Sequence, residues 1–199
     1  MKLKEFIAGL AEVMQVESTE LATVDRALAK QGLRQLARGR FHPDITLEEG
    51  VQLVCAWAGS FKLTEAASEV ERLKSFSPRQ IPNDEYELIT KNSKTFASLF
   101  GAEERDLYGM NFVEAACWLT EQLGSGKYPA DRIWLSVTKG GEPEMSGSWR
   151  FKFRTLSFFQ FPETLDFDRM KPVPQRNVEI KASIRGPVLK WIFDVTEVS

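Results

Sequence analysis

The chain contains few of the residues that most enzymes and secreted proteins depend on. Its 199 residues include one histidine, His42, and two cysteines, Cys55 and Cys117, which lie far apart with no pairing motif. This leaves little material for a histidine-based metal site or a catalytic triad, and it indicates buried thiols in a reducing compartment. We therefore expect no enzyme activity, no metal and no cofactor.

Long hydrophobic runs are also missing, so we expect no contact with a membrane. Glu5 and Glu12 interrupt the apolar pattern of the N-terminus, which argues against a signal peptide. The hydrophobic fraction of 43% is nevertheless high enough to form a core. Together these features predict a folded cytoplasmic protein.

The net charge of −2 conceals an uneven distribution along the chain. Residues 81–130 carry 4 basic and 8 acidic side chains, whereas the segments on either side are neutral or slightly basic. The segment from Arg26 to Pro43 contains no acid at all. Its basic residues are Arg26, Lys30, Arg34, Arg38 and Arg40. Such a segment favours binding of phosphate groups, and a solvated basic surface without a ligand is the alternative.

Apolar residues recur at helical spacing through much of the first 124 residues. Thr46 and Asn111 are each followed three positions later by glutamate, which predicts two capping boxes. Gly32 is placed to close a helix in the left-handed conformation. The expected helices cover residues 2–14, 19–31, 46–59, 64–74, 83–100 and 111–124.

The pattern changes to alternation after residue 130. Strands are expected at 133–138, 149–154, 178–185 and 189–195, the last two as a hairpin around Gly186-Pro187. Helices followed by strands predict an α+β fold with a small antiparallel sheet. The prolines Pro78 and Pro82 indicate a linker. We expect an N-terminal helical domain (1–76), a linker (77–82) and an α+β domain (83–199).

The order of elements near the N-terminus resembles a winged helix-turn-helix. A helix, a turn near residues 16–18 and a second helix precede an arginine-rich loop with glycine. The pattern Thr23-Val24-x-Arg26-Ala27-Leu28-x-x-x-Gly32-Leu33 resembles the recognition helix of many bacterial regulators. This resemblance implies that helix 19–31 enters the major groove of DNA and that loop 34–42 contacts the backbone as a wing.

The candidate DNA-binding residues follow from this arrangement. Leu21, Val24 and Leu28 would pack against the first helix, and the outward side chains would read bases. Asp25 and Glu20, in the same helix, would repel phosphate and weaken the case. The expected DNA-binding residues are Thr23, Arg26, Ala27 and Lys30 in the helix and Arg34, Arg38, Gly39, Arg40 and His42 in the loop.

The chain as a whole is also similar to uncharacterised bacterial and prophage-encoded proteins that begin in the same way. We therefore expect a transcriptional regulator, or a phage or prophage accessory protein, that binds double-stranded DNA, with a homodimer matching palindromic half-sites. A protein-interaction or inhibitory module that binds a host protein without nucleic acid is the alternative. A third reading, a metal-dependent nuclease, would use Glu179 and Lys181 with Asp166 and Asp168 upstream.

Overall fold

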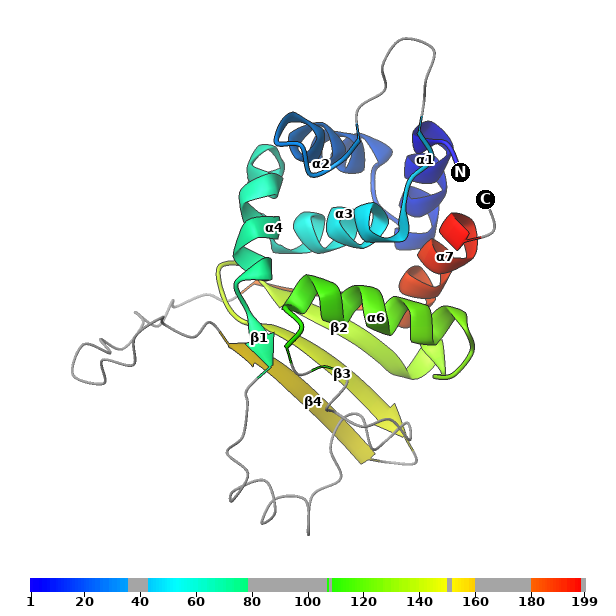
Figure 1. Ribbon diagram of the computed structural model, residues 1–199, viewed down its shortest axis with the longest axis vertical. Coiled ribbons are helices and arrows are strands. Elements are labelled where there is room, and N and C mark those ends of the chain that lie inside the picture. The colour runs from blue at the N-terminus through cyan, green and yellow to red at the C-terminus, as the bar shows by residue number, and fades with distance from the viewer. Residues whose placement is uncertain (36–42, 79–106, 108, 150–151, 160–179, 198–199) are drawn as a thin grey trace, which may run out of the picture.

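The computed structural model describes residues 1–35, 43–78, 107, 109–149, 152–159 and 180–197. Helices and an antiparallel sheet make up this part of the chain, so the expected α+β class is confirmed (Figure 1). The helices are α1 (Leu3–Met14), α2 (Ser18–Lys30), α3 (Leu47–Gly59), α4 (Ala66–Lys74), α6 (Phe112–Gly124) and α7 (Gly186–Glu197), with 3-10 turns η1 (Leu63–Glu65) and η4 (Ala130–Arg132). The strands are β1 (Ser77–Pro78), β2 (Ile133–Thr138), β3 (Pro143–Trp149), β4 (Lys152–Phe159) and β5 (Lys181–Arg185).

Local sequence signals account for the ends of several helices. Both predicted capping boxes are present: Glu49 N donates to Thr46 Oγ1, and Thr46 N donates to the Glu49 carboxylate. Asn111 caps α6 in the same way. Gly32 closes α2 with a φ of 75°, as expected, and Leu33 N donates to Leu28 O. Helix α2 begins at Ser18, one residue before the expected start, and its N-cap Glu17 forms no side-chain cap hydrogen bond.

Among the described residues the strands pair in the order β1-β4-β3-β2-β5, and every pairing is antiparallel. The predicted strand 149–154 is wrong, because the chain reverses there between β3 and β4. The predicted linker also begins differently, since Ser77 and Pro78 pair with β4 as strand β1. The predicted helix 83–100 lies outside the described residues.

The expected hairpin at the C-terminal end is wrong as well. Strand β5 pairs with β2, and the residues expected to form its partner belong to helix α7. The apolar residues of the segment 189–195 fit both the two-residue period of a strand and the 3.6-residue period of a helix, and packing decides between the two. Val188, Leu189 and Ile192 fall on one face of α7 and are buried, and α7 packs against α1, α3 and α6. Pro187 is compatible with this helix because a proline in the first turn loses no hydrogen bond.

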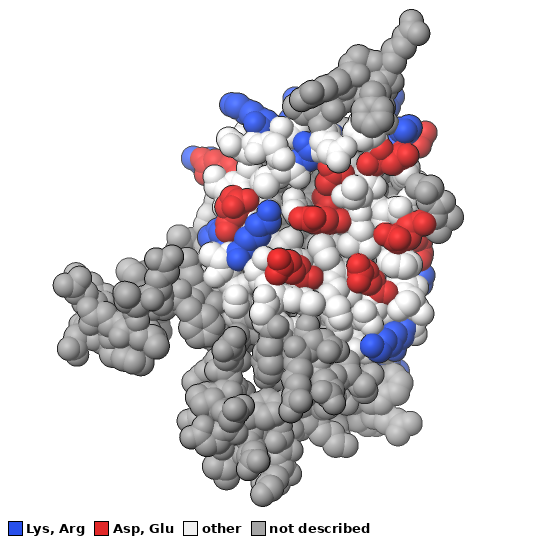
Figure 2. Space-filling view, in the orientation of Figure 1, with Lys and Arg blue, Asp and Glu red and all other residues white. Residues whose placement is uncertain are grey.

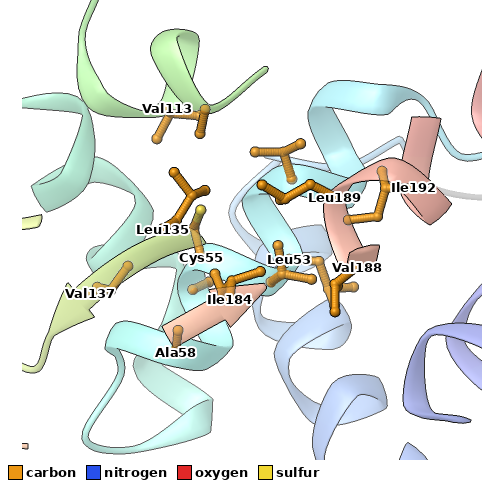
Figure 3. Close-up of a cluster of buried hydrophobic side chains, with 14 of the residues drawn as sticks. Leu53, Cys55, Ala58, Val113, Leu135, Val137, Ile184, Val188, Leu189 and Ile192 are labelled. Carbon is orange, nitrogen blue, oxygen red and sulfur yellow. The ribbon is translucent and has the colours of Figure 1, made fainter. Parts of the chain in front are cut away.

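A single hydrophobic cluster joins the two predicted domains. Helix α3 lies at its centre and contacts α2 and α4 on one side and β2, β5, α6 and α7 on the other (Figure 1). Leu53 and Cys55 of α3 point toward Leu135 of β2, Ile184 of β5 and Leu189 of α7 (Figure 3). Each fully buried leucine contributes roughly 1.5–3 kcal/mol. The core therefore does not divide at the predicted linker.

Candidate nucleic-acid interface

A three-residue turn, residues 15–17, joins α1 to α2. Gln15 adopts a left-handed conformation with a φ of 57°, and its N–H donates to Glu12 O. Val16 N donates to Ala11 O at 3.0 Å, which satisfies a second carbonyl at the end of α1. Helix α2 then packs against α1 through Leu21, Val24 and Leu28, which are buried as expected. One side of α2 is thereby fixed toward the core, and the opposite side faces outward.

Asp25, one of the two acids of α2, is almost completely buried. Its side chain is 5% exposed and forms an ion pair with Arg34, which is 11% exposed. Burial raises the pKa of the Asp25 carboxyl above its ordinary value, and the charge and hydrogen bonding of Arg34 act in the opposite direction. The carboxylate of Asp25 is therefore largely shielded from solvent and has a cationic partner.

The other acid of α2, Glu20, also has a partner within the protein. Trp57 of α3 donates from Nε1 to Glu20 Oε2 at 2.9 Å. This hydrogen bond holds the Glu20 carboxylate beside α3, which packs against α2. The two acids that argued against DNA binding in the sequence are thus held by internal partners.

The outward face of α2 keeps the polar residues that were predicted to contact DNA. Arg26 and Lys30 are exposed and lie one helical turn apart, and Thr23 is half-buried beside Arg26. Arg26 Nε donates to Ala22 O at 3.1 Å, and Nη2 donates to Thr23 Oγ1 at 3.2 Å. Because a guanidinium has five N–H donors, three remain for a ligand, two on Nη1 and one on Nη2.

A second helix adds a basic residue that the sequence analysis did not select. Lys4 of α1 and Arg26 of α2 both line a hollow of ≈ 390 Å³ between the two helices. Leu3, Ile7 and Ala22 supply apolar lining there, and Asp25, in its ion pair with Arg34, also lines the hollow. Lys4 and Ala8 are four residues apart on α1, so both lie on the side of that helix that faces α2. This helical spacing is the feature of the sequence that could have identified Lys4.

The remaining predicted residues have different outcomes. Ala27 is half-buried and packs against the core, so it presents little of its methyl group to a ligand. Arg34 was predicted to contact phosphate, but its guanidinium is buried in the ion pair with Asp25, which corrects that prediction. The predicted loop residues Arg38, Gly39, Arg40 and His42 lie outside the described residues, so the predicted wing does too.

The nuclease reading gains no support from the residues that the structure describes. Lys181 forms an ion pair with Glu144 across the sheet, and Asp166, Asp168 and Glu179 lie outside the described segments. Within those segments no group of three or more histidine, cysteine or acidic residues is placed to hold a metal ion.

The cysteines are arranged as structural residues. Cys55 is fully buried, and its burial raises the pKa of the thiol far above the ordinary value. Burial also raises the pKa of Cys117 to about 12, with further contributions from the nearby carboxylates of Glu48 and Glu121. Thiols of this kind are poor nucleophiles at neutral pH, because the reactive thiolate is scarcely populated.

A groove with acidic walls was not singled out from the sequence. On the face shown in Figure 2, acidic side chains gather over α3 and α6. A groove of ≈ 840 Å³ opens there. Its lining includes Glu114, Cys117, Trp118 and Glu121, which share one face of α6 at helical spacing. That spacing, within the acidic segment 81–130, was the signal available in the sequence.

No protein family, curated protein or solved structure that was compared with this chain matches it. Within the described residues, no helix combines the length and the apolar character needed to cross a membrane.

Proposed function

We propose that the protein binds double-stranded DNA through the outward face of α2, as a transcriptional regulator or a phage or prophage accessory protein of winged helix-turn-helix type. The observation that carries the proposal is the charge of the exposed side of α2, where the fully exposed charged side chains are those of Arg26 and Lys30. Asp25 is buried in its ion pair with Arg34, and half-buried Glu20 accepts a hydrogen bond from Trp57, so neither acid belongs to the fully exposed residues of the helix.

The residues divide by the chemistry they offer. Arg26 has one free N–H on Nη2 and two on Nη1, which suits a two-point contact with the O6 and N7 atoms of guanine. Lys4 and Lys30 end in compact ammonium groups that suit phosphate contacts without base selectivity. Helix α1 would then lie along the backbone while α2 enters the major groove.

Fluorescence anisotropy with labelled duplexes tests the proposal. One duplex is random in sequence, and the others are selected from a random pool by binding to the full chain. Arg26→Ala should weaken binding to selected duplexes by about tenfold or more and reduce the preference for them, because a two-point base contact contributes ~1–3 kcal/mol. Lys30→Ala should weaken binding to all duplexes alike and reduce the dependence of log K on log salt by about 0.9.

Lys190→Ala is the matched control, because Lys190 is a half-exposed lysine on α7, paired with Asp194 and far from α2 in sequence. Its affinity for DNA should equal that of the unchanged protein. Equal losses in the Lys30 and Lys190 variants, or no binding of any duplex at low salt, would overturn the proposal. The homodimer and the alternative of a module that never binds nucleic acid stay predictions.

A further inference from the structure

The groove with acidic walls is formed by the start of α3, the end of α4, helix α6 and the end of α7. Its volume of ≈ 840 Å³ is in the range of pockets that bind ligands, about 300–1,000 Å³. It shares no lining residue with α2. The described residues that line it are Thr46, Leu47, Glu48, Lys74, Met110, Asn111, Val113, Glu114, Cys117, Trp118, Glu121 and Glu197.

Apolar side chains form much of the lining. Leu47, Met110 and Trp118 are half-buried, so each keeps apolar surface in contact with water. The Trp118 ring packs at 6.0 Å from the Tyr128 ring, measured between centroids, which limits its freedom to turn away. A preformed apolar surface of this kind can bury the side chains of a partner at little cost in ordering.

The walls carry a clear excess of negative charge. Among the described residues, four glutamates and one lysine line the groove. Glu114 caps its own helix by accepting from Asn111 N, and Glu48 accepts from the Gln52 amide through one oxygen. In the described part of the chain, the side chains of Glu121 and Glu197 have no hydrogen-bond or ion-pair partner.

Lys74, the lysine among the described lining residues, does not neutralise these acids. Lys74 Nζ lies 3.6 Å from Glu71 Oε1, and Glu71 is not part of the groove. Burial is the main cause of the raised pKa of Cys117, and the carboxylates of Glu48, Glu121 and Glu114 raise it further, whereas Lys74 lowers it. Phosphate groups of DNA or of lipids would be repelled from such a surface.

We propose that this groove binds a basic amphipathic segment of a partner protein, with its apolar side chains against Leu47, Met110 and Trp118. Lysine or arginine side chains of the segment would pair with the carboxylates of Glu48, Glu121 and Glu197. Charge complementarity determines this choice, since a cationic segment gains both ionic and apolar contacts here. The inference does not depend on DNA binding.

Binding of two synthetic peptides to the full chain tests the proposal. Both peptides are amphipathic helices with leucine on one face, and the other face carries lysine in one peptide and glutamate in the other. The labelled lysine peptide should bind saturably in an anisotropy titration and the glutamate peptide should not. A variant with Glu48→Gln, Glu121→Gln and Glu197→Gln should bind the lysine peptide about tenfold more weakly, since three exposed ion pairs are lost.

The matched control carries Glu5→Gln, Glu12→Gln and Glu17→Gln, which removes three exposed acids outside the groove. It should bind the lysine peptide as the unchanged protein does. Thermal melts followed by circular dichroism establish that both variants are folded. An equal loss in the two variants, or no saturable binding of the lysine peptide at low ionic strength, would overturn the proposal.

A variant in the apolar lining gives a separate readout. Met110→Ser should weaken the lysine peptide several-fold, and this loss should persist at high salt, where ionic contacts are screened. If light scattering instead shows a dimer that the groove variant dissociates, the occupant is a second copy of this chain and the proposal is wrong. Duplex binding should be unchanged in all groove variants, so failure here is distinguishable from failure of the DNA proposal.

Discussion

The pair formed by Asp25 and Arg34 permits a demanding test of how α2 is held. Both side chains are almost fully buried, so replacing Arg34 with methionine leaves a carboxylate in the interior without its counter-charge. Removing one partner of a buried ion pair typically costs about 3–5 kcal/mol, a large part of the stability of a typical domain. We therefore expect Arg34→Met to lower the free energy of unfolding by about 3 kcal/mol or more at pH 7, measured by urea denaturation.

The loss should depend on pH in a definite direction. Burial already raises the pKa of Asp25, and Arg34 is the largest influence that lowers it, so the pKa should rise further in the variant. A carboxyl with a raised pKa binds more protons in the folded state than in the unfolded state over the interval between the two pKa values. Stability is therefore lost as pH rises through that interval, by about 1.4 kcal/mol for each unit of pKa difference.

The destabilisation caused by Arg34→Met should accordingly shrink when the pH is lowered from 7 towards 4. The double variant Asp25→Asn/Arg34→Met, which has no charge to strand, should recover much of the lost stability at pH 7. A single variant whose loss is the same at every pH, with no recovery in the double variant, would refute the reasoning. Asp25 would then be an ordinary solvated carboxylate.

Three further outcomes follow from packing and burial. Cys55 and Cys117 should resist iodoacetamide at pH 8 in the folded protein and react with it in urea, because burial raises the pKa of both thiols. Mass spectrometry measures the labelling, and rapid labelling of the folded protein would contradict this expectation. Gly124→Ala should lower the melting temperature, because a Cβ there would lie 2.0 Å from the Phe193 ring, and an unchanged melting temperature would show that the ring moves freely. Thr46→Ala should cost about 1 kcal/mol in urea denaturation by removing a helix cap, and no change would mean that the cap is redundant.

The helical half of the fold was predictable because its signals are local. The capping residues Thr46 and Asn111 and the closing residue Gly32 act within one turn of their own helix, and the structure places them as expected. The apolar spacing of α2 likewise identified its buried side. Interactions between residues within one helical turn of each other can be predicted from the sequence alone.

The C-terminal part was predicted poorly because its signals depend on distant partners. Residues 189–195 suit a strand and a helix almost equally, and packing of α7 against α1, α3 and α6 selects the helix. The reversal between β3 and β4 likewise depends on pairing across the sheet. Neither partner can be identified from an alternating pattern alone.

The candidate interface was predictable in its outward residues and not in its electrostatics. Helical spacing placed Arg26 and Lys30 outward, as the structure does. The partners of the acids in α2 could not be inferred, since Glu20 bonds to Trp57, 37 residues away. The ion pair between Arg34 and Asp25 could not be inferred either, since it forms only when the chain folds. Arg34 was therefore predicted to contact phosphate.

The most direct test of the central claim is a map of amide chemical-shift changes when a selected duplex is added to the full, isotopically labelled chain. The account predicts the largest changes at Thr23, Arg26 and Lys30 of α2, with a smaller set at Lys4 of α1, and no changes along the acidic groove of α6. Changes confined to other elements, with α2 unaffected at saturating duplex, would contradict the account.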